Sequence, residues 1–119
     1  MKKTVVIGAS LNPERYSYKA IQALVAHGIE TLALGLREGT VAGINIQLKL
    51  ENAKHIDTVT LYVGPHHQAQ WQETILALSP RRVIFNPGTE NAAIENLLQS
   101  KGISVEHACT LVLLATDQY

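Results

Sequence analysis

Several residue classes are scarce in this chain of 119 residues, and each scarcity excludes a class of protein. Cys109 is the single cysteine, so the chain forms no internal disulfide and offers no cysteine pair to a zinc ion. No stretch approaches the roughly 18 consecutive apolar residues that a membrane-spanning helix needs. The apolar run that begins at Thr4 is broken at Gly8, which excludes a secretory signal peptide. We therefore expect a soluble, cytoplasmic protein with no membrane partner.

Net charge is also absent, since ten Lys and Arg residues balance ten Asp and Glu residues. Without an overall positive field, the chain has no general attraction for nucleic acid or for an anionic membrane surface. No repeat, linker or low-complexity tract divides the sequence, and its length predicts one domain, residues 1–119. Because small domains bury a modest fraction of their surface, a homodimer or a complex with a partner protein is left open.

Apolar runs typical of buried strands alternate with helical patterns along the whole chain. The predicted strands cover residues 4–7, 30–34, 58–63, 82–85 and 103–106. Helical patterns follow from Ser17 to a glycine stop at Gly28, from Pro65 to about residue 79, and from an N-cap at Thr89 to a glycine stop at Gly102. The apolar tail, residues 109–115, favours a last helix packed on the sheet.

The alternation of strands and helices predicts the fold class. Crossover helices between strands require a parallel sheet, so we expect a doubly wound α/β fold with a mainly parallel sheet. Residues 35–57 are the least regular part, and for them we predict a loop with a short extended segment and a helical turn. Ligands of such folds bind at the carboxyl ends of the strands, near the point where the strand order reverses.

The loop after the first predicted strand, residues 8–17, is where this architecture commonly holds phosphate groups. It is not the glycine-rich dinucleotide fingerprint, because Ser10 and Pro13 occupy two of the glycine positions. Free backbone N–H groups and the helix dipole still favour an anion there, and Ser10, Arg15 and Lys19 can add hydrogen bonds. A polar turn with a solvated arginine and lysine is the alternative.

Side chains suited to catalysis lack recognisable partners in the sequence. NAD requires an acidic residue at the end of the second strand, and residues 32–36 contain none. His66 and His67 are adjacent, so on a helix they would point about 100° apart and share a metal poorly. Cys109 is interpreted as a small buried side chain. Since no P-loop, paired catalytic carboxylates or nucleophile elbow is present, we expect neither an enzyme nor a metal protein.

Several motifs along the chain resemble those of one known family. They are Gly8-Ala9-Ser10, Asn12-Pro13 and the stretches 15–20, 59–63, 82–91 and 108–110. Together they resemble the small stand-alone CoA-binding proteins, whose domain is similar to the CoA-binding domain at the amino end of the succinyl-CoA synthetase alpha subunit. The resemblance spans nearly the whole chain and implies a three-layer, Rossmann-like fold with a sheet of about five strands.

The resemblance also implies a ligand, CoA or acyl-CoA, and a set of binding residues. The residues implied to hold the phosphates are Gly8, Ala9, Ser10, Asn12, Arg15, Ser17 and Lys19. The stretch from Val63 to His66 would line the adenosine side, and Asn86, Pro87 and Gly88 would close the mouth of the cleft. Residues 33–38 depart from the Pro-x-Asn-Pro type of turn that is usual in the family.

The hypothesis from the sequence is therefore a non-catalytic protein that binds a small CoA-type ligand. One alternative is a small NAD(P)-dependent enzyme in which Arg37 lies near a 2′-phosphate. The other is an interaction subunit without a ligand, which keeps the fold and docks through its apolar tail.

Overall fold

The computed structural model describes residues 2–119, and these residues build one sheet of seven strands. The strands are β1 (Thr4–Ala9), β2 (Thr31–Gly35), β3 (Gly39–Val41), β4 (Ile44–Gln47), β5 (Thr58–Leu61), β6 (Arg82–Phe85) and β7 (Ser104–His107). Their order across the sheet is β3-β4-β2-β1-β5-β6-β7, and every neighbouring pair is parallel except β3 with β4. The prediction of a doubly wound, mainly parallel sheet is confirmed, whereas the count of about five strands is wrong.

The two additional strands arise within residues 35–57, for which a loop, a short extended segment and a helical turn were predicted. β3 and β4 form an antiparallel hairpin whose turn residues, Ala42 and Gly43, have φ angles of 50° and 79°. Positive φ at both positions is the geometry of a type I′ turn, which twists in the same sense as the strands it joins. Ile46 of β4 is buried and pairs with Ala33 of β2. The hairpin escaped prediction because alanine is not a residue that signals such a turn.

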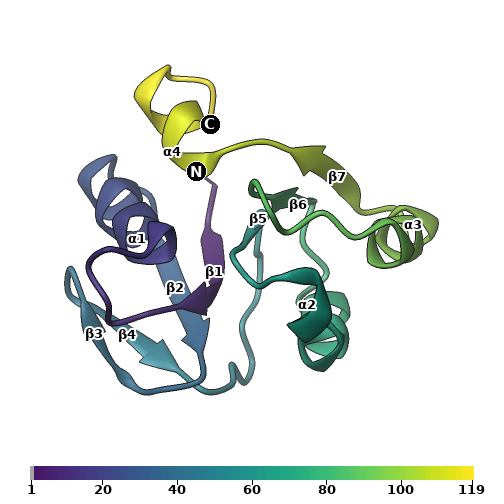
Figure 1. Cartoon of the computed structure of the whole chain (residues 1–119), viewed down its shortest axis with the longest axis horizontal. Coiled ribbons are helices and arrows are strands. Elements are labelled where there is room, and N and C mark those ends of the chain that lie inside the picture. The colour runs from purple at the N-terminus through teal and green to yellow at the C-terminus, as the bar shows by residue number, and fades with distance from the viewer. Residues whose placement is uncertain (1) are drawn as a thin grey trace.

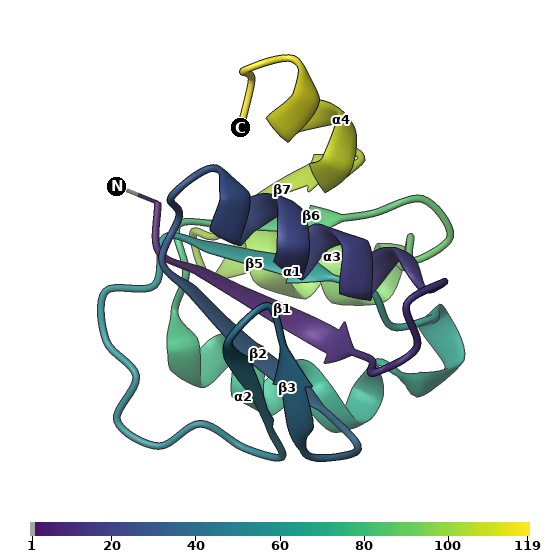
Figure 2. The same ribbon diagram turned by 90° about the vertical axis from the view of Figure 1, so that its left-hand side faces the viewer.

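Helices cover both faces of the sheet (Figures 1 and 2). α1 (Tyr16–Ala26) and α4 (Thr110–Ala115) lie on one face, and α2 (Gln72–Leu78) and α3 (Ala92–Ser100) lie on the other. Two apolar cores fill the spaces between these layers. The larger core contains Ile75 of α2 and Leu98 of α3, and the smaller contains Leu24 of α1 and Leu114 of α4. The three-layer arrangement predicted from the sequence is therefore present.

The helix ends correct two details of the prediction. The segment after Pro65 first forms two 3₁₀ turns, η1 (Pro65–His67) and η2 (Ala69–Trp71), and α2 begins only at Gln72. The N-cap of α3 is Asn91 and not Thr89, because the Asn91 Oδ1 atom accepts a hydrogen bond from the Ile94 N–H at 3.4 Å. The Glu95 side chain, four residues after the N-cap, accepts from the Asn91 N–H at 2.8 Å and so satisfies a further donor at this helix end.

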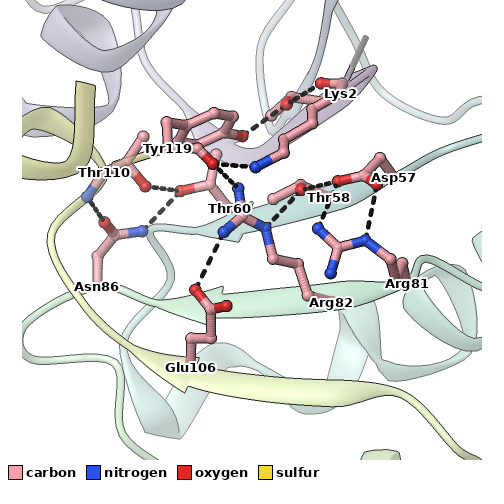
Figure 3. Close-up of polar contacts among 11 residues, drawn as sticks. Lys2, Asp57, Thr58, Thr60, Arg81, Arg82, Asn86, Glu106, Thr110 and Tyr119 are labelled. Atoms are coloured by element: carbon pink, nitrogen blue, oxygen red, sulfur yellow. Dashed lines mark hydrogen bonds and ion pairs between the residues drawn. The ribbon is translucent and has the colours of Figure 1, made fainter. Parts of the chain in front are cut away.

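A polar cluster holds the amino ends of the central strands, at the edge of the sheet where β1, β5 and β6 begin (Figure 3). The buried Arg82 guanidinium donates to the Thr58 hydroxyl at 2.8 Å and pairs with Glu106 at 3.1 Å. The Tyr119 ring lies over that guanidinium at 4.6 Å, and its hydroxyl is 2.6 Å from the Thr4 hydroxyl. The segment after α4 is thereby fixed against the base of the sheet. No helix within residues 2–119 combines the length and the apolar composition needed to cross a membrane.

Candidate functional site

A cleft of about 760 Å³ opens where β1, β2, β5 and β6 end. The strand order reverses between β1 and β5, so the cleft occupies the switch point at which doubly wound folds bind their ligands. Its lining residues come from the loops that follow these strands. They are Gly8, Ala9, Ser10, Leu11, Asn12, Arg15, Tyr16, Ser17, Gly35, Leu36, Arg37, Tyr62, Val63, Gly64, His67, Gln70, Trp71, Pro87, Gly88 and Thr89.

Two glycines allow the strand ends to approach one another at the floor of the cleft. Gly8 has a φ angle of 94°, and a Cβ atom at this position would lie 2.8 Å from the main-chain oxygen of Tyr62. A Cβ atom at Gly35 would lie 2.5 Å from the main-chain oxygen of Ala9. Both contacts are with backbone, which cannot swing aside as a flexible side chain can. The backbones at the floor of the cleft can therefore lie this close together because neither position carries a side chain.

The loop between β1 and α1 is stiffened by its own polar side chains. The Ser10 hydroxyl oxygen accepts from the Asn12 N–H at 3.0 Å, and the Asn12 side-chain oxygen accepts from the Glu14 N–H at 3.0 Å. Such Asx-type turns hold a loop without using the N–H groups of the following helix. The loop therefore leads into α1 in a defined geometry.

The amino end of α1 is left open towards the cleft. Arg15 is the N-cap residue, its side chain accepts nothing from the first turn, and the first turn contains no acidic residue. The Lys19 N–H makes the first bond of the helix, to the Arg15 main-chain oxygen at 3.3 Å, so the N–H groups before it have no acceptor within α1. These free donors and the positive end of the helix dipole favour an anion beside Ser17.

The charge of the lining is one-sided. Arg15 and Arg37 contribute two guanidinium groups, and His67 contributes an imidazole. The residues named as lining the cleft include no aspartate or glutamate, although the chain as a whole has no net charge. The acidic side chains of the protein therefore lie outside the lining of the cleft. A lining of this composition suits a ligand that carries several negative charges.

Aromatic residues form the wall on the side of β5. Trp71, the single tryptophan of the chain, is 7% exposed and lines the cleft together with Tyr62. Burial raises the pKa of the Tyr62 hydroxyl to about 12, so this side chain stays a neutral phenol at physiological pH. Tyr62 and Trp71 therefore contribute apolar contact area and no charge.

Most of the site residues expected from the sequence and the family resemblance meet in this one cleft. Those that line it are Gly8, Ala9, Ser10, Asn12, Arg15, Ser17, Val63, Pro87 and Gly88. Three others lie elsewhere. The Lys19 ammonium sits over the Tyr16 ring at 5.5 Å, and His66 is exposed on η1, where its neighbour His67 lines the cleft instead. Asn86 is buried and directed into the protein.

Asn86 has a structural set of partners. Its side-chain nitrogen donates to the Thr60 hydroxyl at 2.7 Å, and its side-chain oxygen accepts from the Thr110 N–H at 2.9 Å (Figure 3). The same nitrogen donates to the Leu61 main-chain oxygen at 2.9 Å. These bonds tie β6 to β5 and to the start of α4. Asn86 thus supports the loop that carries Pro87 and Gly88, while its own side chain contacts other parts of the fold.

Sequence reasoning missed several lining residues. Tyr62 and Thr89 were predicted near the ends of a strand and a helix, and Trp71 was predicted inside a helix. Leu36 lies in the segment predicted as irregular. Arg37 was considered only for the NAD(P) alternative, yet it lines the cleft directly after β2. The available signal was its place after a strand, since basic residues at the carboxyl ends of parallel strands face the ligand site.

Groups that could support other chemistry are dispersed. Within residues 2–119, no three His, Cys, Asp or Glu side chains gather in a way that could hold a metal ion. The Cys109 thiol is free and half-buried at the N-cap of α4, outside the lining of the cleft.

These features define a class, the Rossmann-like α/β domains that carry a ligand cleft at the switch point of a parallel sheet. The family model of the CoA binding domain matches residues 2–115. The chain therefore belongs to the CoA binding domain family, as the motifs around the first loop and Asn86 indicated.

Solved structures share the fold of this chain. An uncharacterized protein is similar at 42% identity and a TM-score of 0.96, over 100% of this chain and 98% of the other. A hypothetical protein from Pyrococcus horikoshii OT3 shares the fold at 22% identity and a TM-score of 0.84, over 93% and 80%. The dinucleotide-forming acetyl-coenzyme A synthetase 1 of Ca. Korarchaeum cryptofilum, solved with phosphate and ADP, shares it at 14% identity and 0.70, over 89% and 25%. Among curated proteins, none matches this chain.

Proposed function

We propose that the chain binds CoA or an acyl-CoA in the cleft, with the diphosphate at the amino end of α1. The observation that carries the proposal is the one-sided charge of the lining, in which Arg15 lies beside the uncapped first turn of α1 and Arg37 lies after β2. CoA carries a diphosphate and a separate phosphate on its ribose, which are two anionic groups for two guanidinium groups. Membership of the CoA binding domain family supports the same ligand.

The loop after β2 favours a ligand with a phosphorylated ribose. NAD needs a carboxylate there for its ribose hydroxyls, and the lining residues after β2 are Gly35, Leu36 and Arg37. A guanidinium at this place suits a phosphate monoester, because it donates in a bidentate geometry. CoA and NADP share that feature, so NADP is the second candidate, and Arg37 is the observation that favours it.

We further infer a binding function without catalysis. The ionisable lining groups of the cleft are two arginines, one histidine and the phenols of Tyr16 and Tyr62. Nucleophilic catalysis typically uses a nucleophile that a neighbouring base activates through a hydrogen bond. The hydrogen bonds between side chains within residues 2–119 include none that joins two of these groups. A carrier or sensor of CoA-type ligands fits these groups.

The test is a titration followed by the fluorescence of Trp71, which lines the cleft and is the single tryptophan. We expect saturable binding of CoA and weaker binding of dephospho-CoA, with NADP as the competing arm. Arg15→Ala should weaken every phosphorylated ligand by about 10- to 100-fold, the worth of a charge-assisted hydrogen bond, and should flatten the salt dependence. Arg37→Ala should weaken CoA and leave dephospho-CoA unchanged.

One control makes the result specific. Lys101→Ala removes a positive charge after α3, outside the lining of the cleft, and this variant should bind CoA within about twofold of the unaltered chain. Saturable binding of NADP with none of CoA would replace the first candidate by the second. No saturable fluorescence change with any of these ligands would overturn the proposal.

A further inference from the structure

Two buried polar atoms have no hydrogen-bond partner within residues 2–119, the Tyr62 hydroxyl oxygen and the Gln68 side-chain oxygen. Both residues belong to the segment after β5, which forms one wall of the cleft. Buried polar groups are nearly always paired, so an unpaired one needs a physical reason. Gln68 is 1% exposed, and the reason is found in the hydrogen bonds of its side-chain amide nitrogen.

The Gln68 amide nitrogen joins two separate loops of the cleft. It donates to the main-chain oxygen of Val63 at 2.9 Å, after β5, and to that of Thr89 at 2.5 Å, after β6. Both of these residues line the cleft. Turning the carboxamide over would set its oxygen against two carbonyl oxygens, so this orientation is required and the Gln68 oxygen is left without a donor. The Gln68 side-chain oxygen is therefore unpaired because the amide nitrogen bonds to both main-chain oxygens.

Thr89, one of the two residues that Gln68 contacts, is itself held by hydrogen bonds. The Thr89 hydroxyl donates to the Asn86 main-chain oxygen at 2.7 Å, and the Thr89 N–H donates to the same oxygen at 3.0 Å. Asn86 is in turn bonded to Thr60 and Thr110 in the interior. Gln68 therefore connects the wall that contains the two short 3₁₀ turns to a loop that the buried hydrogen bonds of Asn86 already hold.

We propose that Gln68 is a positioning residue, which sets the spacing of the loops after β5 and β6 and so keeps the cleft in its ligand-ready shape. The inference rests on the proposed function, since the cleft is taken as the CoA site. Walls that are ordered before the ligand arrives need not be ordered by it, so fixing their spacing in advance strengthens binding. Gln68 itself does not line the cleft, and its effect on the ligand passes through Val63 and Thr89.

The test compares Gln68→Met with Gln99→Met. The first removes both donors and keeps the length and volume of the side chain, while the second makes the same change at an exposed site on α3. CoA binding is measured by Trp71 fluorescence at a temperature at which both variants are folded by circular dichroism. We expect the dissociation constant for CoA to rise about tenfold or more in Gln68→Met and to stay unchanged in Gln99→Met.

Hydrogen exchange supplies a readout that needs no ligand. Faster amide exchange in Gln68→Met should be confined to residues 62–71 and 86–91, with β1, β5 and β6 protected as in the unaltered chain. A merely structural role would instead raise exchange across the sheet. Should Gln68→Met fold poorly, Gln68→Asn takes its place, because its shorter side chain retains the amide but cannot reach both carbonyl groups.

The possible failures are distinguishable. Unaltered CoA affinity in Gln68→Met, with normal binding by the unaltered chain, overturns the positioning role and leaves the proposed function standing. Absence of CoA binding by the unaltered chain overturns the proposed function, and the inference is then decided by hydrogen exchange alone. Equal exchange in the two loops of Gln68→Met and Gln99→Met would overturn it.

Discussion

Replacing Gly8 by alanine tests the close approach of β1 and β5 that forms the floor of the cleft. The new Cβ atom would lie 2.8 Å from the Tyr62 main-chain oxygen, and the residue would keep a φ angle of 94°. A left-handed conformation costs a non-glycine residue about 1–2 kcal/mol. Pressing a methyl group against backbone costs about 1–3 kcal/mol more.

The expected loss of about 2–5 kcal/mol in the free energy of unfolding is a large part of the roughly 5–15 kcal/mol typical of a domain. For a chain of this length, 1 kcal/mol corresponds to about 4 °C in melting temperature. Gly8→Ala should therefore lower the melting temperature by about 8–20 °C. Calorimetry and urea titration of the same samples measure the two quantities independently.

Gly28→Ala is the matched control, since Gly28 has a φ angle of 72° and a Cβ atom there would meet nothing within 4 Å. It should incur the conformational cost alone, about 1–2 kcal/mol and about 4–8 °C. Gly8→Ala must be clearly the more damaging of the two. Equal losses in both variants would refute the claim that contact with the backbone of Tyr62 constrains position 8.

Two further predictions concern other parts of the fold. Ala42→Asn should raise the free energy of unfolding by about 0.5–1 kcal/mol, because Ala42 has a φ angle of 50° in a type I′ turn and asparagine tolerates this conformation. A lower melting temperature of the variant would contradict this turn geometry. The hydrogen bond from Arg81 holds the pKa of Asp57 below its ordinary value of 3.8, aided by the Thr58 hydroxyl and opposed by burial. A lowered pKa in the folded state stabilises the fold above pH 3.8, and this contribution is lost as the pH falls through the lowered value. Urea midpoints measured against pH should thus fall less steeply in acid for Arg81→Met than for the unaltered chain, and identical slopes would show that the pair does not couple to folding.

The fold could be predicted from the sequence because its signals are local. Short apolar runs that end at glycine or proline, separated by helical patterns, specify strands and crossover helices, and these permit a parallel sheet in few arrangements. Gly28 and Gly102 lie two residues after the ends of α1 and α3, each just past the C-cap, and have the φ angles of 72° and 78° that helix stops require. The hairpin of β3 and β4 could not be predicted, because Ala42 adopts its left-handed conformation only within the finished turn.

The candidate site could also be predicted in part, because some of its determinants are local in the sequence. Strand ends are visible in the sequence, and since parallel strands all end at one edge of the sheet, the residues after β1, β5 and β6 had to meet there. This reasoning and the family motifs together placed Ser10, Arg15 and Gly88 in one cleft.

Tertiary structure alone decided the direction of each side chain. Asn86 sits among cleft residues in the sequence, but three buried hydrogen bonds turn its side chain inward, since burying its amide unpaired would be costly. Gln68 shows no signal in the sequence, because its partners lie 5 and 21 residues away and are backbone oxygens, which every residue possesses. The sequence therefore determined which loops form the cleft, and the packing of these loops against one another determined which side chains face a ligand and which hold the walls in place.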